Sequence, residues 1–133
     1  MPRRILVVED NAANLELARY LLAAAGYTVL TAEDGEEGLR VALQECPDLI
    51  ISDLQMPGMN GYEFLEQVRK DERLRDVCVI AVTAYSMSGD RNKVLAAGFN
   101  GYLSKPIVPE TFVLQVEAYL PSGPDAGHPP DDQ

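Results

Sequence analysis

Residues 49–68 read LIISDLQMPGMNGYEFLEQV and contain both of the patterns that decide the fold of this chain. Leu49–Ser52 is a short, continuous and mainly apolar run, which is typical of a strand buried on both faces in a parallel sheet. A loop follows, and Phe64, Leu65 and Val68 then recur at helical spacing. This order of strand, loop and helix predicts one unit of an α/β fold.

The same alternation continues through the rest of the chain. Apolar runs predict four further strands, at Ile5–Val8, Thr28–Thr31, Val77–Thr83 and Gly101–Ser104. Helical spacing predicts four further helices, with stripes of Leu15, Ala18, Leu22 and Ala25; Leu39, Ala42, Leu43 and Cys46; Val94, Leu95 and Gly98; and Phe112, Val113, Val116 and Leu120. Helices should stop at Gly26, Pro47 and Gly98. Five strand–helix pairs predict a doubly wound α/β fold with a five-stranded parallel sheet and right-handed crossovers.

Length and composition indicate a single globular domain. The 133 residues are 47% hydrophobic and 24% charged, which suffices for one core but not for two. We assign residues 1–120 to this domain. Residues 121–133 (PSGPDAGHPPDDQ) hold too few apolar side chains for a core, and we interpret them as a disordered tail or linker.

Charge and composition also exclude several classes of protein. The net charge of −10 provides no basic surface for nucleic acid or an anionic membrane. No apolar run approaches the ~20 residues of a membrane helix, and the N-terminal region does not resemble an export signal. Cys46 and Cys78 are too few for a disulfide framework and favour a reducing, cytoplasmic location. The single histidine, His128, lies in the tail and argues against histidine-based catalysis.

Polar residues follow the expected strands at the point where each strand ends. The first strand leads to Glu9 and Asp10, the third to Asp53, the fourth to Thr83 and the fifth to Lys105. The carboxyl ends of parallel strands share one edge, so these side chains should meet there. Clustered carboxylates suit Mg²⁺, and a carboxylate can attack phosphorus to give an acyl phosphate. The lysine and the threonine hydroxyl would then contact the phosphoryl oxygens.

Other functions fit these residues less well. An aspartate-nucleophile phosphatase needs a second acid two residues after the first, but that position holds Gln55, which cannot act as a general acid. A nucleotide-binding protein needs a glycine-rich loop after the first strand, where this chain has acids. A third alternative is a docking scaffold that takes no phosphate. Taken singly, Asp10 or Asn11 could simply cap a helix, and Lys105 could be a surface lysine.

Four segments resemble bacterial two-component response regulator receiver domains: VEDN at 8–11, SDLQMPGMNG at 52–61, VTA at 82–84 and YLSKP at 102–106. The resemblance covers roughly residues 4–120. It is greatest to small single-domain regulators of the chemotaxis type and to the receivers of hybrid kinases. It implies a flavodoxin-like sheet of order 2-1-3-4-5, which the strand count alone leaves open.

The resemblance also implies roles for individual residues. Asp53 is the phosphoacceptor, and Asp10 and Asp53 bind Mg²⁺ together with the backbone carbonyl of Gln55. Glu9 replaces the more usual first aspartate, and its longer arm reaches the metal directly or through water. Thr83 and Lys105 contact the phosphoryl oxygens. Tyr102 is the aromatic side chain that swings inward when Thr83 moves.

The same resemblance implies the partners of the chain. The phosphoryl group comes from a sensor histidine kinase or a histidine phosphotransfer protein, and the protein target binds residues of about 86–119. Such a chain is a switch and not an enzyme, beyond its own phosphoryl transfer and slow dephosphorylation. The Lys105–Pro106 bond is expected to be cis.

The lifetime of the phosphoryl group depends on which side chains flank the path of an attacking water. By analogy with the family, these are Gln55 and Tyr85. Gln55 is neutral and activates water poorly, and Tyr85 is bulky enough to shield the group, while Ala84 leaves room for the donor. We therefore expect slow self-dephosphorylation. The alternative is that Tyr85 points outward on the surface that binds the target.

Overall fold

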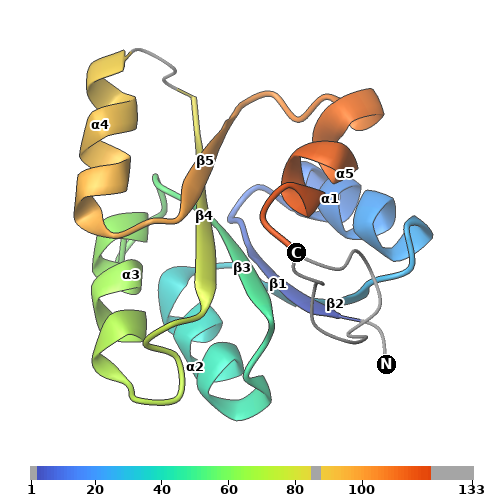
Figure 1. The fold of residues 1–133 in the computed structure, drawn as a ribbon. Helices are drawn as coiled ribbons and strands as arrows, with labels where there is room; N and C mark the ends of the chain where they lie inside the picture. Colours follow the sequence, from blue (N-terminus) through green and yellow to red (C-terminus); the bar gives the residue numbers. More distant parts are fainter. Residues whose placement is uncertain (1–2, 85–87, 121–133) are drawn as a thin grey trace, which may run out of the picture.

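A parallel sheet forms the centre of the molecule (Figure 1). The computed structural model describes residues 3–84 and 88–120, and the expected tail at 121–133 lies outside them. Within these residues the sheet has five strands in the order β2-β1-β3-β4-β5, and every neighbouring pair is parallel. The strands are β1 (Arg4–Val8), β2 (Thr28–Ala32), β3 (Leu49–Asp53), β4 (Cys78–Thr83) and β5 (Gly101–Ser104). The flavodoxin-like fold and its strand order are confirmed.

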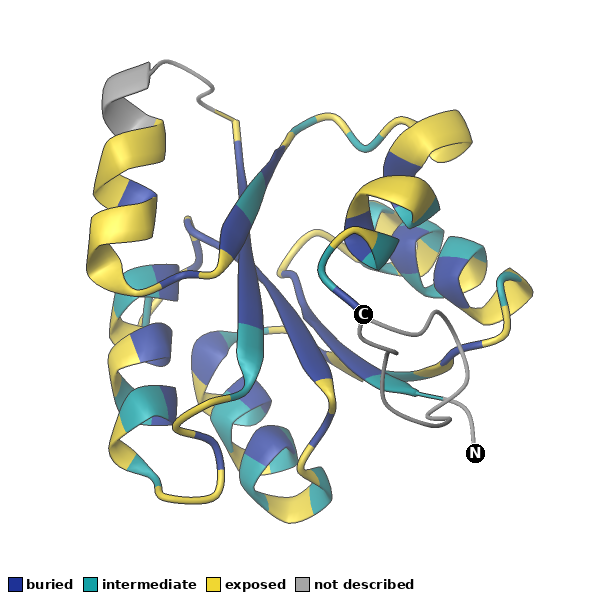
Figure 2. Ribbon diagram, in the orientation of Figure 1, coloured by how far each residue is buried: buried dark blue, intermediate teal, exposed yellow. Residues whose placement is uncertain are grey.

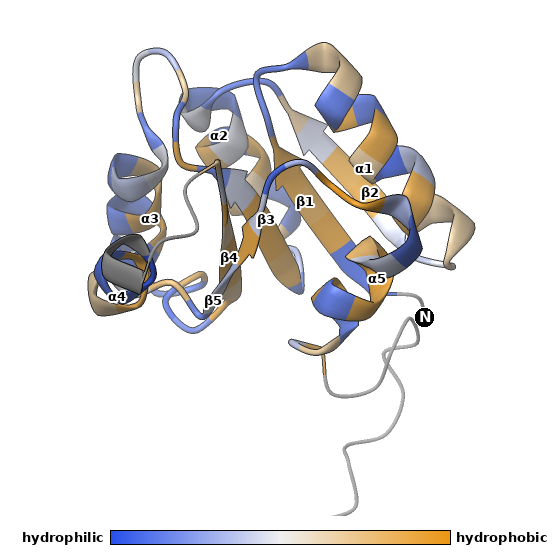
Figure 3. Ribbon diagram, turned by 90° about the horizontal axis from the view of Figure 1, so that it is seen from above, coloured by the Kyte–Doolittle hydropathy of each residue, from blue (hydrophilic) through white to orange (hydrophobic). Residues whose placement is uncertain are grey.

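Helices cover both faces of the sheet. In the described part of the chain they are α1 (Ala12–Ala24), α2 (Gly35–Glu45), α3 (Gly61–Lys70), α4 (Ser88–Ala97) and α5 (Pro109–Glu117). Figure 1 places α2, α3 and α4 on one side of the sheet and α1 and α5 on the other, and the view from above in Figure 3 shows the same division. None of these helices is both long and apolar enough to cross a membrane.

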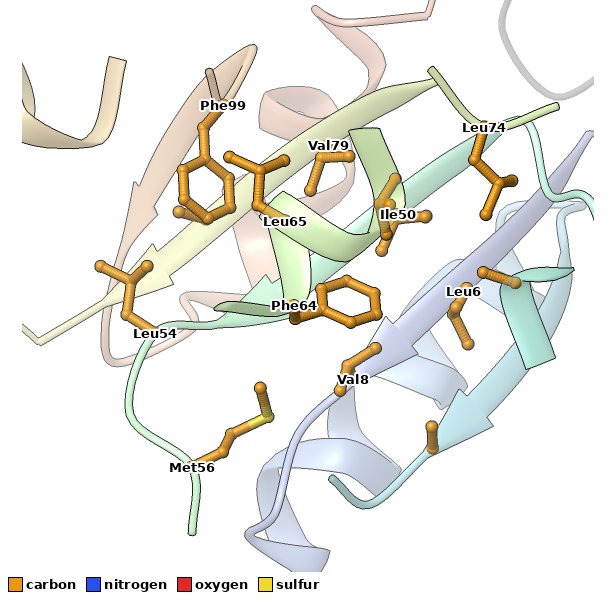
Figure 4. Close-up of a cluster of buried hydrophobic side chains, with 14 of the residues drawn as sticks. Leu6, Val8, Ile50, Leu54, Met56, Phe64, Leu65, Leu74, Val79 and Phe99 are labelled. Atoms are coloured by element: carbon orange, nitrogen blue, oxygen red, sulfur yellow. The ribbon is translucent and has the colours of Figure 1, made fainter. Parts of the chain in front are cut away.

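This three-layer arrangement creates two apolar cores, one on each face of the sheet. β3 is buried at all five positions, as its continuous apolar run predicts. Alternate side chains enter opposite cores: Ile50 packs with Leu6, Val79 and Phe64 beneath α2 and α3 (Figure 4), whereas Leu49 and Ile51 pack with Leu22 and Phe112 beneath α1 and α5. The buried residues accordingly follow the strands and the inner faces of the helices (Figure 2).

The helix ends confirm the local stop signals in the sequence. Gly26 and Gly98 follow α1 and α4 at positive φ values of 103° and 113°, a conformation that glycine adopts readily. Cys46 caps α2 at a φ of 47°, directly before Pro47. At the start of α3, the Asn60 side chain and the helix form a reciprocal capping box.

Three apolar positions differ from the sequence-based expectation. Val77 precedes β4, because its N–H donates to the Leu74 oxygen (3.1 Å) in a turn. Cys46 is exposed because it lies beyond the last turn of α2. Leu95 is 42% exposed, and among residues 91–97 of α4 only Val94 is buried. A short apolar stripe therefore overstated how firmly α4 packs on the sheet.

Arg69 joins the C-terminal end of α3 to the turn between α4 and β5. Its guanidinium donates to the backbone oxygens of Val77 (2.7 Å) and Gly98 (3.0 Å) and to Asn100 Oδ1 (2.9 Å). Asn100 in turn exchanges two hydrogen bonds of 2.8 Å with the backbone of Val79. These bonds fix the end of α4 that is remote from the carboxyl edge of the sheet.

Candidate functional site

The carboxyl ends of the strands bring most of the expected site residues together. Asp53 and Thr83 are the last residues of β3 and β4, and both are buried. Glu9 directly follows β1, and Lys105 directly follows β5. The Lys105 Nζ lies 2.8 Å from Asp53 Oδ2 and 3.4 Å from Glu9 Oε1. One ammonium group therefore pairs with carboxylates from two other strands.

Three carboxylates form a cluster at this edge. Glu9, Asp10 and Asp53 each place one carboxylate oxygen within 4.8 Å of the others. Glu9 and Asp53 are only 5% and 4% exposed, whereas Asp10 is exposed. Oxygen ligands without a nearby histidine or thiolate are those that Mg²⁺ prefers. The residues present therefore fit a magnesium ion.

Backbone N–H groups orient the buried carboxylates. The Asn11 N–H donates to Glu9 Oε2 (3.0 Å), and the Gln55 N–H donates to Asp53 Oδ1 (3.3 Å). The Asn11 side chain also caps α1, so Asp10 is not the capping residue. This arrangement decides between two readings of the sequence: the carboxylate of Asp10 belongs to the acidic cluster and not to the helix end.

Burial, hydrogen bonds and neighbouring charges shift two pKa values in the cluster. Burial raises the pKa of Glu9, the Asn11 N–H opposes this effect, and the charge of Asp53 adds to it. Burial alone would lower the pKa of Lys105, but the hydrogen bond and charge of Asp53, together with Glu9, raise it above its ordinary value. Lys105 therefore remains a cation at neutral pH and offsets part of the negative charge.

Thr83 connects this cluster to a neighbouring pocket. The Lys105 N–H donates to the Thr83 oxygen (2.8 Å), which ties the ends of β4 and β5 together, and the Lys105–Pro106 bond is cis as expected. Thr83 and Gln55 also line a pocket of about 630 Å³ that extends to Tyr62 on α3 and Lys93 on α4. The pocket thus lies between the ends of β3 and β4 and the helices α3 and α4.

Tyr102 lies apart from the acidic cluster, on the side of β5 that faces α4. It is half-buried, and the guanidinium carbon of Arg91 lies 5.7 Å from the centroid of its ring. Similarly, Lys93 Nζ lies 5.3 Å from the centroid of the Tyr62 ring. Neither cation is identified by the sequence, since no local pattern relates α4 to these rings. Tyr85, the expected shield of the phosphoryl group, lies outside the described residues.

Gly61 holds the loop after Asp53 against the end of β3. Its N–H donates to the Leu54 oxygen (2.9 Å), and a Cβ at this position would lie 2.5 Å from the Asp53 backbone oxygen. A backbone atom cannot move aside without displacing Asp53 itself. We therefore expect Gly61→Ala to lower the free energy of unfolding by about 3 kcal/mol, measured by urea denaturation.

Gly58, in the same loop, provides a matched control. It has a φ of +74°, but an added Cβ would meet nothing within 4 Å. Gly58→Ala should therefore cost only the strain of the left-handed conformation, about 1 kcal/mol. If Gly61→Ala proves no more destabilising than Gly58→Ala, the steric explanation is wrong.

The fold and the site together define a class: a flavodoxin-like α/β domain with a cluster of carboxylates at the carboxyl edge of its sheet. Comparison with known proteins specifies the family. The chain belongs to the response regulator receiver domains, whose family model matches residues 5–117.

Individual relatives agree with this assignment. The polar-differentiation response regulator DivK of Brucella anthropi is 39% identical over 120 residues, which cover 90% of this chain and 98% of the relative. The structure of the Vibrio cholerae chemotaxis protein CheY4 has a TM-score of 0.85 and 32% identity, covering 90% of this chain and all of that protein. The protein is thus a receiver domain of two-component signalling and resembles single-domain regulators.

A second solved structure bears on the metal. The receiver domain of a sensor histidine kinase from Pseudomonas aeruginosa has a TM-score of 0.80 and 34% identity, covering 90% of this chain and 98% of that domain. It contains a magnesium ion coordinated in its active-site cleft. Receiver domains take up Mg²⁺ at an acidic site, and this chain has an acidic cluster at the corresponding edge of its sheet.

Proposed function

We propose that Asp53 is the residue that accepts the phosphoryl group, in a reaction that depends on Mg²⁺. The observation that carries this proposal is the 2.8 Å contact between Asp53 Oδ2 and the Lys105 ammonium at the buried end of β3. A carboxylate held beside a cation can approach a phosphoryl group whose negative charge would otherwise repel it. The deciding experiment is phosphorylation of the wild type and of Asp53→Asn.

We propose that Asp10, Asp53 and the backbone carbonyl of Gln55 bind the ion, and that Glu9 contributes directly or through water. The proximity of the three carboxylate groups supports this assignment. When bound, Mg²⁺ neutralises charge on the transferred group. The protein contributes the geometry: it holds these carboxylates close together at the ends of β1 and β3.

The transfer we propose is an in-line displacement at phosphorus. An oxygen of Asp53 forms the new O–P bond, the P–N bond to the histidine of the donor breaks, and its electron pair leaves with the imidazole. The Lys105 ammonium and the Thr83 hydroxyl contact the phosphoryl oxygens. The donor is a sensor histidine kinase or a histidine phosphotransfer protein. Self-dephosphorylation, the only other catalysis in this proposal, is slow.

Phosphorylation then changes a surface that binds another protein. We propose that Thr83 moves toward the phosphoryl group and that Tyr102 turns inward, which alters the surface formed by residues of about 86–119. The half-buried position of Tyr102 beside α4 and the 68% exposure of Leu114 support this location. The receiver domain in this proposal comprises residues 1–120 and works in the cytoplasm, without contact to nucleic acid or a membrane.

A further inference from the structure

Glu9 makes a contact that spans much of the sheet. It follows β1, whereas Lys105 follows β5, and β3 and β4 lie between these two strands. Neighbouring strands are about 4.8 Å apart, so β1 and β5 are separated by roughly 14 Å. Glu9 Oε1 nevertheless lies 3.4 Å from Lys105 Nζ. Two long side chains bridge the distance.

Both oxygens of Glu9 have partners within the protein. Oε1 pairs with Lys105, and Oε2 accepts the Asn11 N–H at 3.0 Å. The residue is only 5% exposed. The carboxylate of Asp10, by contrast, is on an exposed residue. Glu9 is thus held in a fixed orientation, and Asp10 is the more accessible of the two acids.

We propose that Glu9 is a positioning residue that aims Lys105 at the phosphoryl group, and that in this chain the contact depends on the length of the glutamate side chain. The inference rests on the proposed role of Asp53. When Asp53 carries the phosphoryl group, one of its oxygens is bonded to phosphorus and its own negative charge is lost. The ion pair with Glu9 remains, and it keeps the ammonium at the end of β3 throughout the transfer.

The length of the side chain sets the reach of this contact. Aspartate is shorter than glutamate by one carbon–carbon bond, about 1.5 Å. At position 9 it would leave its carboxylate roughly 5 Å from the ammonium, which is too far for an ion pair. Glu9→Asp therefore keeps the charge of the acidic cluster but removes the bridge.

The test combines Glu9→Asp with Lys105→Met in a double-mutant cycle. With acetyl phosphate as donor and saturating Mg²⁺, we expect Glu9→Asp to slow phosphorylation about three- to tenfold. In the Lys105→Met background it should have little further effect, because its action passes through Lys105. The Mg²⁺ affinity of Glu9→Asp, measured by calorimetry, should stay close to the wild-type value, whereas Asp10→Asn should lose most of it.

Several outcomes would overturn the inference. Glu9 would act through the cation alone, and not through Lys105, if Glu9→Asp weakens Mg²⁺ binding as much as Asp10→Asn does, or if its effect is undiminished in the Lys105→Met background. Glu9→Gln keeps the length but removes the charge, so it should also slow phosphorylation and have little further effect in the Lys105→Met background; an undiminished effect there would contradict a positioning role. This variant also serves if Glu9→Asp does not fold.

One readout is independent of phosphorylation. The protons of the Lys105 ammonium, observed through its ¹⁵N resonance, should exchange slowly with water in the wild type and faster in Glu9→Asp. An unchanged exchange rate of these protons would refute the positioning role even if Asp53 is the acceptor. Conversely, failure of the Asp53 proposal would appear as labelling of Asp53→Asn and would leave this resonance unaffected.

Discussion

Acetyl phosphate with Mg²⁺ should add one phosphoryl group to the wild-type protein and none to Asp53→Asn. Asp53 is the carboxylate that ends β3 and contacts the Lys105 ammonium at 2.8 Å. The neutral amide of asparagine is a poor nucleophile toward phosphorus, so the substitution removes the reacting group while preserving its shape. The expected effect is complete loss of labelling, measured as the mass of the intact protein.

A matched control is Asp76→Asn, which removes an exposed acid from the turn before β4, at the opposite edge of the sheet. This variant should be labelled to the same extent as the wild type. Circular dichroism of Asp53→Asn would show whether the fold is intact. Labelling of a folded Asp53→Asn protein at the wild-type level would assign the phosphoryl group to a different residue.

Millimolar Mg²⁺ should stabilise the wild-type fold and have much less effect on Asp10→Asn. A ligand present at tenfold its dissociation constant adds about 1.4 kcal/mol to the free energy of unfolding. For a domain of this size that corresponds to a rise in melting temperature of roughly 4–8 °C. In metal-free buffer, Asp10→Asn should melt above the wild type, because it relieves repulsion among the clustered carboxylates of Glu9, Asp10 and Asp53.

The melting curves should be recorded with EDTA and then across a Mg²⁺ titration. Asp48→Asn tests whether the loss of any acid has this effect, since Asp48 directly precedes β3, at the edge of the sheet remote from the acidic cluster, where it accepts a hydrogen bond from the Arg4 N–H. That variant should keep the full response to Mg²⁺. A normal metal-induced rise in Asp10→Asn would mean that this residue is not a principal ligand.

The sheet was largely predictable from the sequence because burial on both faces leaves a simple signal. The continuous apolar run at 49–52 marks β3, and all of its residues are buried. The ends of the strands then gave the positions of Asp53, Thr83 and Lys105 without further information. The strand order required the family resemblance, since apolar periodicity does not determine which strands are neighbours.

The side-chain contacts of the site were not predictable in the same way. The pairing of Glu9 with Lys105 crosses two intervening strands, and the stacking of Arg91 on Tyr102 joins a helix to a strand. Such contacts depend on side-chain conformations in the folded protein. These conformations leave no periodic pattern in the sequence. The apolar stripe of α4 misled for a related reason: Val94 is buried, but Leu95 faces solvent.

The hydrogen bonds of Arg69 have a mechanical consequence for α4. They clamp the turn at Gly98 and Asn100 to the base of β4, while the opposite end of the helix leads toward Thr83. Within residues 91–97 of α4, Val94 is the buried side chain, so the helix is held mainly at the end that Arg69 fixes. Any shift that begins at Thr83 would swing the near end of α4 through the widest arc and leave Gly98 almost stationary.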